Sequence, residues 1–133
     1  MKTFLNTLLV SLMIWLGVSC SSNTPESVAE DFAESIYSGD YDHARELCTP
    51  ESAEAIGLVQ GLSAKYVEDI KKCNPDVKVL SCEMAEDEET ATVKLEIKNA
   101  FSLKDKAVDP EPNSETYKMQ KVDGKWRVHV SIK

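Results

Sequence analysis

The chain has 133 residues, with 23 acidic and 15 basic side chains and a formal net charge of −8. This length suits one domain, and a hydrophobic content of 42% is enough for a core and argues against disorder. An acidic chain is repelled by phosphate backbones, so nucleic acid is not expected as a partner. It also does not adhere electrostatically to anionic lipid, so membrane attachment would require a covalent anchor.

The first 19 residues differ from the rest of the chain. Lys2 is their only charge, and their centre, FLNTLLVSLMIWLGV, is apolar. A positive start, a short apolar segment and small residues before a cleavage site are typical of a secretory signal peptide. A permanent transmembrane helix is the alternative, but a span needs about 20 apolar residues, and this run is shorter and contains Asn6. We therefore interpret residues 1–19 as a signal peptide.

Cys20 directly follows this segment. The stretch LGVSC, residues 16–20, resembles a bacterial lipobox, in which a small residue such as Ser19 precedes the cysteine. The resemblance implies cleavage before Cys20 and acylation of its thiol and new amino terminus, and two or more acyl chains anchor a protein stably in a bilayer. Because Ser21 is not Asp, the outer membrane of a Gram-negative-type envelope, facing the periplasm, is favoured. An ordinary signal peptide ending near a cysteine is the alternative. Residues 20–24 would form a short lipidated tether.

Three helices are predicted before residue 74. Thr24-Pro25-Glu26 is typical of a helix start, and Asp40 can cap a short second helix over residues 41–48. Thr49-Pro50-Glu51 repeats the start signal, and Asn74-Pro75 ends the third helix. The spacing of apolar residues places Ile56, Val59, Leu62, Tyr66 and Ile70 on one face of that third helix.

After residue 75 the apolar residues alternate, which is typical of antiparallel strands covered on one face. Residues 86–89 and Asp123-Gly124 are predicted to be hairpin turns, and residues 104–115 a loop fixed by Pro110 and Pro112. The strand positions predicted to face the helices include no acid and no histidine; they are Leu80, Cys82, Met84, Ala91, Val93, Leu95, Ile97, Tyr117, Met119, Trp126, Val128, Val130 and Ile132.

This order of elements predicts an α+β domain over residues 25–133, with three N-terminal helices packed on a curved antiparallel sheet of about four strands. The stretches FAESIYSGDYDHARELCTPE and DGKWRVHVSIK resemble the opening and the close of the nuclear transport factor 2-like (cystatin-like) superfamily. Within it the chain is most similar to bacterial lipoproteins with domain of unknown function 4878, also described as lumazine-binding-like. The resemblance implies a cone-like domain, but this fold hosts many functions and implies none by itself.

Three cysteines remain once Cys20 is assigned to the anchor. The envelope is oxidising, so a disulfide is plausible, and an odd count leaves one thiol over. A Cys48–Cys82 bond, which would join the second helix to the first strand, is the favoured hypothesis. A Cys73–Cys82 bond is the second choice, and three buried thiols are the alternative to both.

Metal, cofactor and catalytic signals are weak. His43 and His129 have no metal-ligand spacing and are interpreted as surface residues, so no metal or cofactor is expected. Without an inward acid or base, no catalytic residue is assigned and the chain is not expected to be an enzyme. Seven residues would surround the mouth of the cone and could line a pocket for a small apolar ligand, although a filled core is the plainer interpretation: Phe32, Tyr37, Tyr66, Met84, Tyr117, Met119 and Trp126.

The functional hypothesis is therefore a non-catalytic envelope lipoprotein that binds a small ligand or a protein. An enzyme of the isomerase or dehydratase kind using the cone is the first alternative. An immunity or assembly protein acting through its exposed sheet is the second. The lipid bilayer, reached through Cys20, is the expected partner, and a homodimer through the sheet is a further option, although the outward residues there are polar.

Overall fold

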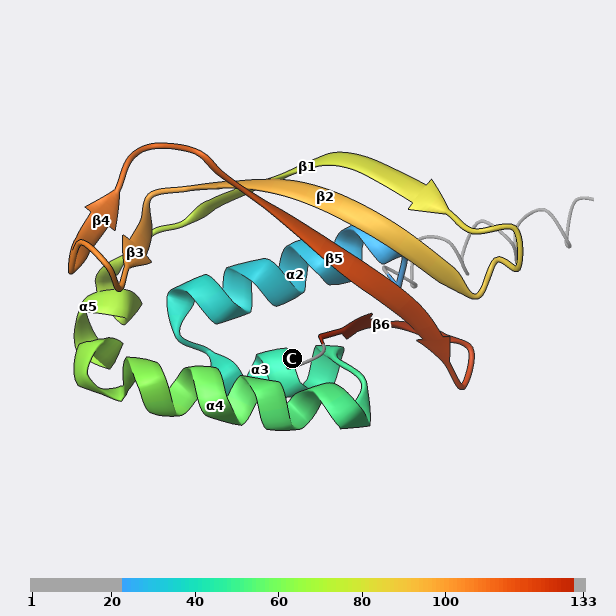
Figure 1. Cartoon of the computed structure of the whole chain (residues 1–133), viewed down its shortest axis with the longest axis horizontal. Helices are drawn as coiled ribbons and strands as arrows, with labels where there is room; N and C mark the ends of the chain where they lie inside the picture. Colours follow the sequence, from blue (N-terminus) through green and yellow to red (C-terminus); the bar gives the residue numbers. More distant parts are fainter. Residues whose placement is uncertain (1–22, 131–133) are drawn as a thin grey trace, which may run out of the picture.

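The computed structural model describes residues 23–130, in which a curved antiparallel sheet wraps around one helix, with further helices below it (Figure 1). The sheet has the order β1-β2-β5-β6. Its strands are β1 (Asp76–Met84), β2 (Thr90–Lys98), β5 (Asn113–Val122) and β6 (Lys125–His129). The predicted signal peptide and Cys20 lie outside the described residues. Within the described part of the chain, no helix is long and apolar enough to cross a membrane.

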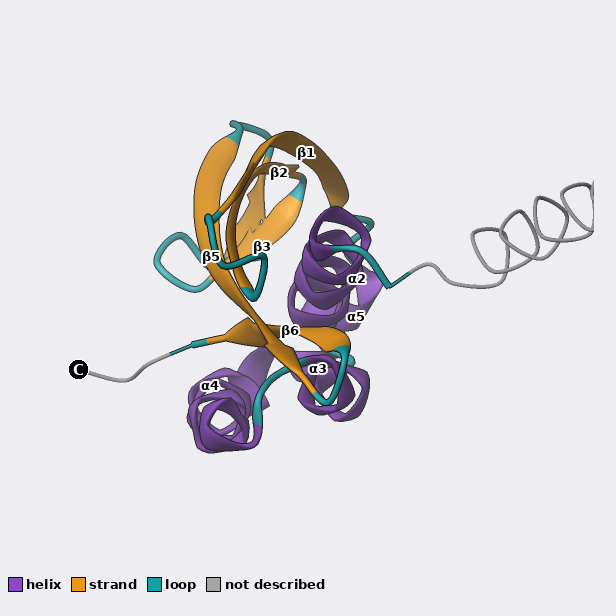
Figure 2. Cartoon of the chain, turned by 90° about the vertical axis from the view of Figure 1, so that its right-hand side faces the viewer, coloured by secondary structure: helices purple, strands orange, loops and turns teal. Residues whose placement is uncertain are grey.

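The helix α2 (Pro25–Ser38) lies along the concave face of the sheet (Figure 2). It begins as predicted, because the Thr24 side chain accepts a hydrogen bond from the Ser27 amide and Pro25 occupies the first turn. It ends at Gly39, whose φ of 85° is the left-handed conformation that glycine adopts without strain. Asp40 then caps α3 (Tyr41–Leu47) by accepting a hydrogen bond from the His43 amide. The first two predicted helices are therefore confirmed.

The core lies between α2 and the sheet. Alternation along β2 is regular, with Ala91, Val93, Leu95 and Ile97 all buried. From α2 the core takes Val28, Ala29, Phe32 and Ala33, which lie three or four residues apart on one face. The α+β class and the four-stranded antiparallel sheet with helices on one face are thus as predicted.

The third predicted helix is interrupted. A 3-10 turn, η1 (Pro50–Ser52), precedes α4 (Ala53–Ser63), and a second one, η2 (Ala64–Tyr66), separates α4 from α5 (Val67–Lys72). At the break the Ser63 hydroxyl donates to the Val59 carbonyl, 2.7 Å away, and lies 2.7 Å from the buried Tyr41 hydroxyl. A serine bonded to the carbonyl four residues earlier bends a helix, and here Tyr41 holds the bend in place.

Two further expectations are wrong in detail. A bulge between Val79 and Ser81 shifts the register of β1, so that Val77 and Val79 face inward and Leu80 is 44% exposed. The predicted loop at residues 104–115 contains β4 (Ala107–Asp109), which pairs with β3 (Ala100–Ser102), and it also contains the start of β5. The two predicted tight turns are confirmed, and Asp123 and Gly124 both have positive φ at the second one.

Candidate functional site

The space between α2 and β5 is filled by an inner cluster of four side chains: Phe32, Tyr37, Glu115 and Tyr117. The Tyr37 hydroxyl donates a hydrogen bond to Glu115 Oε1 over 2.9 Å. The rings of Phe32 and Tyr117 pack edge to face, with centroids 5.2 Å apart. The hydrogen bond joins residues that are 78 positions apart in the chain. Together with the aromatic pair, it closes the space between α2 and the sheet.

Glu115 is an inward acid that the sequence analysis missed. It pairs with the fully buried Leu95 on β2, and paired residues of antiparallel strands share a face of the sheet. The expectation that no inward position carries an acid is therefore wrong. The residue was assigned to the predicted loop, yet it alternates with Tyr117 and Met119, and this alternation was the available signal.

Burial dominates the electrostatics of this cluster. It raises the pKa of the Tyr37 hydroxyl, and the neighbouring Glu115 carboxylate raises that pKa further. Burial likewise raises the pKa of Tyr117, with smaller contributions from Tyr37 and Glu115. Both phenols therefore stay neutral at physiological pH, and the Tyr37 hydroxyl donates to Glu115.

The residues predicted to line one pocket lie in different parts of the fold. Tyr66 packs on Phe101 of β3, with ring centroids 5.5 Å apart. Met84 lies at the end of β1, and Met119 is fully buried. Trp126 is buried under the amine of Lys121, 5.4 Å from the ring centroid. Phe32, Tyr37 and Tyr117 come together as packing in the inner cluster, whereas Met84 and Met119 meet at the end of the sheet.

A hollow of about 530 Å³ lies outside the inner cluster, between the α2–α3 turn and the α4–α5 break. We call it the helix-side hollow. Its lining is mostly polar and includes Ser38, Asp40, Asp42, Gln60 and Lys71, with Tyr41 and Val67. A smaller hollow of about 360 Å³ at the end of the sheet contains Met84 and Met119, and one of about 290 Å³ lies beside β3 and β4. None of the three is formed by the predicted set of seven residues.

Most polar groups around the helix-side hollow are held by neighbours. Arg45 forms an ion pair with Asp42 at 2.8 Å and donates to Gln60. The Asp40 carboxylate accepts from the His43 amide at 3.2 Å. Lys71, by contrast, forms no ion pair or hydrogen bond with any side chain in residues 23–130. The helix-side hollow therefore presents carboxylates together with an ammonium group that has no partner among the described side chains.

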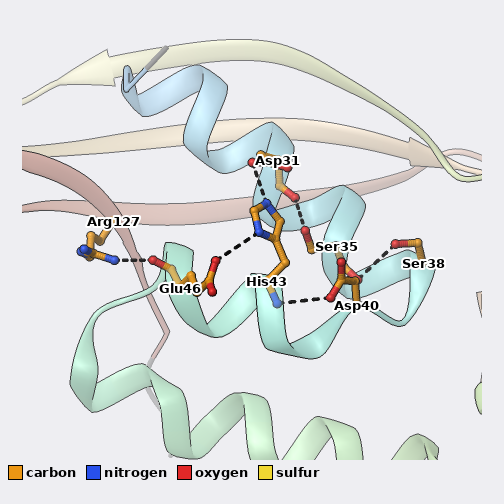
Figure 3. Close-up of polar contacts among 7 residues, drawn as sticks. All are labelled: Asp31, Ser35, Ser38, Asp40, His43, Glu46 and Arg127. Atoms are coloured by element: carbon orange, nitrogen blue, oxygen red, sulfur yellow. Dashed lines mark hydrogen bonds and ion pairs between the residues drawn. The ribbon is translucent and has the colours of Figure 1, made fainter. Parts of the chain in front are cut away.

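His43 of α3 contacts two carboxylates, that of Asp31 on α2 and that of Glu46 on its own helix (Figure 3). Its Nε2 lies 3.0 Å from Asp31 Oδ2, and its Nδ1 lies 3.5 Å from Glu46 Oε2. The hydrogen bond to Asp31 is the main reason that the pKa of His43 is raised. Because both ring nitrogens face carboxylates, the imidazolium is favoured, and this residue has no free nitrogen with which to act as a base.

His129 is linked to a buried pair of hydroxyls. Its Nδ1 lies 3.0 Å from Thr49 Oγ1, which lies 2.6 Å from Ser52 Oγ. Ser52 in turn accepts from the Val130 amide at 2.7 Å and donates to its carbonyl at 3.1 Å. The Ser52 hydroxyl is therefore occupied by hydrogen bonds to Val130, the residue after β6. These bonds attach η1 to the sheet, so Ser52 offers no free nucleophile.

The predicted disulfides are not formed, since Cys48, Cys73 and Cys82 are all free. The backbone of Cys48 forms an isolated parallel β-bridge with Val128 of β6. Cys82 is on β1, at the opposite edge of the sheet. Three strand spacings of about 4.8 Å separate these edges, far beyond the reach of a disulfide. Cys73 precedes β1, and Cys82 lies near the far end of that strand, about 20 Å from its first residue. A Cys73–Cys82 bond is therefore also out of reach. Within residues 23–130, no group of three or more His, Cys, Asp or Glu side chains could hold a metal ion.

Comparisons with known proteins identify the fold. The profile of a family described as Domain of unknown function (DUF4878) matches residues 18–129. A solved structure from Campylobacter jejuni, provisionally named an NTF2-like transpeptidase, is 16% identical with a TM-score of 0.59, and the match covers 81% of this chain and 99% of that one. At this identity the likeness shows the shared NTF2-like fold and not the activity.

Two further solved structures match less well. The intermembrane space region of the chloroplast protein ARC6 is 13% identical, with a TM-score of 0.47 and coverage of 77% of this chain and 90% of that chain. A Xanthomonas campestris protein, provisionally named a calcium/calmodulin dependent protein kinase II association domain, is 15% identical, with a TM-score of 0.46 and coverage of 73% and 74%. No curated protein matches the chain.

Proposed function

The chain belongs to the family of domain of unknown function 4878, and on this premise we propose that it is a lipid-anchored envelope protein that binds a small polar ligand without catalysis. The ligand site is the helix-side hollow. The observation that carries the proposal is that Lys71, which has no partner among the described side chains, lines the same hollow of about 530 Å³ as the carboxylates of Asp40 and Asp42. Ligand pockets of proteins commonly have volumes of roughly 300–1,000 Å³.

The chemistry of the lining defines the class of ligand. Lys71 supplies a positive charge for an anionic group such as a carboxylate. Asp40 keeps lone pairs beyond the one used by the His43 amide, and these accept from an amine or a hydroxyl of the ligand. A small zwitterion, such as an amino acid or a short peptide end, satisfies both groups at once.

The inner cluster supports a binding role over an isomerase-like or dehydratase-like one. An enzyme of that kind needs an acid or base that the substrate can reach within hydrogen-bond distance. Glu115 accepts from Tyr37, and neither residue lines any of the three hollows described above. The proposal therefore assigns these residues to packing and the hollow to binding.

Attachment to the membrane through Cys20 is part of the proposal. Asn23 docks on β6, where its side chain accepts from the Trp126 amide at 2.6 Å and donates to the Trp126 carbonyl at 3.4 Å. Three residues lead from Cys20 to Asn23, and an extended chain covers about 3.5 Å per residue. A lipid on Cys20 would thus hold this end of the domain within roughly 10 Å of the bilayer surface.

Native mass spectrometry of the full chain released from membranes tests both parts of the proposal. The expected result is a mass increase for acyl chains that a Cys20→Ser variant loses, together with a bound small molecule. Lys71→Met should lose the small molecule. Lys72→Met is the matched control, because Lys72 is the next residue but lines the smaller hollow beside β3 and β4. A wild-type chain without acyl groups rejects the anchor, and equal retention by the two lysine variants rejects the site.

A further inference from the structure

The outer face of α4 is unusually apolar for a surface helix. Leu62 is 67% exposed and Leu58 is 52% exposed. They lie one turn apart, beside the exposed glycines Gly57 and Gly61. We call these four residues the α4 face. Figure 2 shows α4 at the outside of the fold, with α3 and β6 on its other sides.

Neither glycine of this face is required by packing or by backbone conformation in the described part of the chain. A Cβ atom added at Gly57 or Gly61 would meet nothing within 4 Å, and neither residue has a positive φ. A glycine inside a helix costs about 1 kcal/mol relative to alanine. Two such glycines beside two exposed leucines are therefore unfavourable in an isolated molecule, and they become favourable where another helix packs closely against this surface.

The charges around the α4 face show which partner fits. Between Glu54 and Lys65 the chain carries no charged residue. Glu54 lies in the first turn of α4, and Lys65 lies in η2, two residues after the last residue of α4, so the two charges lie near opposite ends of this helix. A second copy of α4 running antiparallel would place each Glu54 beside the Lys65 of the other copy, which forms two identical ion pairs by two-fold symmetry.

This register also matches the shapes of the side chains. When Glu54 is opposite Lys65, Leu58 is opposite Gly61 of the second copy, and Leu62 is opposite Gly57. Each exposed leucine then packs over a glycine, which lets the two helix backbones approach. The chain as a whole has a net charge of −8, so two copies repel over most of their surfaces, but the ends of α4 carry balancing charges.

We propose that two copies of this chain associate through their α4 faces as an antiparallel, two-fold symmetric pair. The contact is small, because α4 has 11 residues and is about 16 Å long. It is therefore a weak, reversible dimer at the low end of interface sizes. The inference is independent of the ligand site, since the four residues of the α4 face do not line the helix-side hollow.

Sedimentation equilibrium of the full chain in density-matched detergent tests the proposal. The wild type should show a reversible monomer–dimer equilibrium, which Leu62→Glu should abolish. Leu80→Glu is the matched control, because Leu80 is an exposed leucine on β1 and should leave dimerisation unchanged. Glu54→Lys and Lys65→Glu each turn two attractions into two repulsions and should raise the dissociation constant about tenfold. The double variant Glu54→Lys/Lys65→Glu should restore the affinity of the wild type.

Each other outcome overturns the proposal. A wild type that is monomeric at every concentration rules out the dimer. A dimer that survives Leu62→Glu uses another surface, such as the sheet. A double variant as weak as the single variants rules out the antiparallel register. If the wild type is monomeric, and Leu62→Glu alone weakens its binding to phosphatidylethanolamine–phosphatidylglycerol vesicles, then lipid covers the α4 face instead of a second copy.

Discussion

The hydrogen bond between Tyr37 and Glu115 stabilises the closed interior, and a double-mutant cycle measures its strength. Both residues are half-buried, and the donor and acceptor are 2.9 Å apart. Tyr37→Phe keeps the ring but leaves the Glu115 carboxylate without its donor, which costs about 1–2 kcal/mol. Glu115→Gln retains an acceptor oxygen without the negative charge and should cost about 0.5–1 kcal/mol. In the double variant the side chain at position 115 also lacks the hydroxyl donor, but a neutral amide is less costly to leave unpaired than a carboxylate, so the coupling energy should be about 1 kcal/mol.

Urea unfolding followed by circular dichroism gives the four free energies of unfolding. Tyr66→Phe is the control, because the Tyr66 hydroxyl forms no hydrogen bond with any residue in the range 23–130, and its removal should change stability by less than about 0.5 kcal/mol. Additive effects of Tyr37→Phe and Glu115→Gln, within about 0.3 kcal/mol, would refute the reasoning, because they would show that the bond is not formed in solution.

Three further outcomes are expected. Gly39→Ala should destabilise the protein by about 1–2 kcal/mol, because alanine is strained at a φ of 85° and its Cβ would lie 3.3 Å from Ile70 and Lys71. Gly57→Ala should instead stabilise the protein by up to about 1 kcal/mol. Urea unfolding that gave the two changes the same sign would contradict this prediction. Asp31 and Glu46 raise the pKa of His43 in the folded state. The stabilisation by His43 is therefore complete below its unfolded pKa of about 6.5 and is lost as pH rises through the folded pKa. The melting temperature of the wild type should exceed that of His43→Gln at about pH 5.5 and match it near pH 9. Without reductant, iodoacetamide and peptide mapping should label Cys48, Cys73 and Cys82, with buried Cys48 the slowest; a Cys48–Cys82 peptide pair would contradict the structure.

The sequence predicted those elements whose side chains follow a single uninterrupted period. The β2 residues alternate without a break, and each predicted inward residue is buried. The caps Thr24 and Asp40 depend on local hydrogen bonds, which a few neighbouring residues determine. Where local chemistry and periodicity agree, the prediction needed no knowledge of the rest of the molecule.

Predictions failed where tertiary contacts changed the period. Along β1 the residues that pack on the core are Val77 and Val79 before the bulge and Cys82 after it, so one alternation fitted to the whole strand placed Leu80 on the wrong face, and the predicted inward residue Met84 is 50% exposed. Two prolines made residues 104–115 resemble a loop, which hid Glu115 from the list of inward residues. The missing Cys48–Cys82 bond has the same origin, because the order of strands in the sheet, which places the two residues at opposite edges, cannot be read from spacing.

The break in the third predicted helix creates the helix-side hollow. A straight helix through residues 53–72 would carry Lys71 about 12 Å beyond the end of α4, away from the α2–α3 turn. Because the chain bends at Ser63, α5 returns toward this turn, and a Cβ atom at Gly39 would lie only 3.3 Å from the Lys71 side chain. The hydrogen bond between Tyr41 and Ser63 fixes that bend from within the core. The proposed binding site thus depends on a local irregularity of the helix, and the shared fold alone would not indicate where a ligand binds.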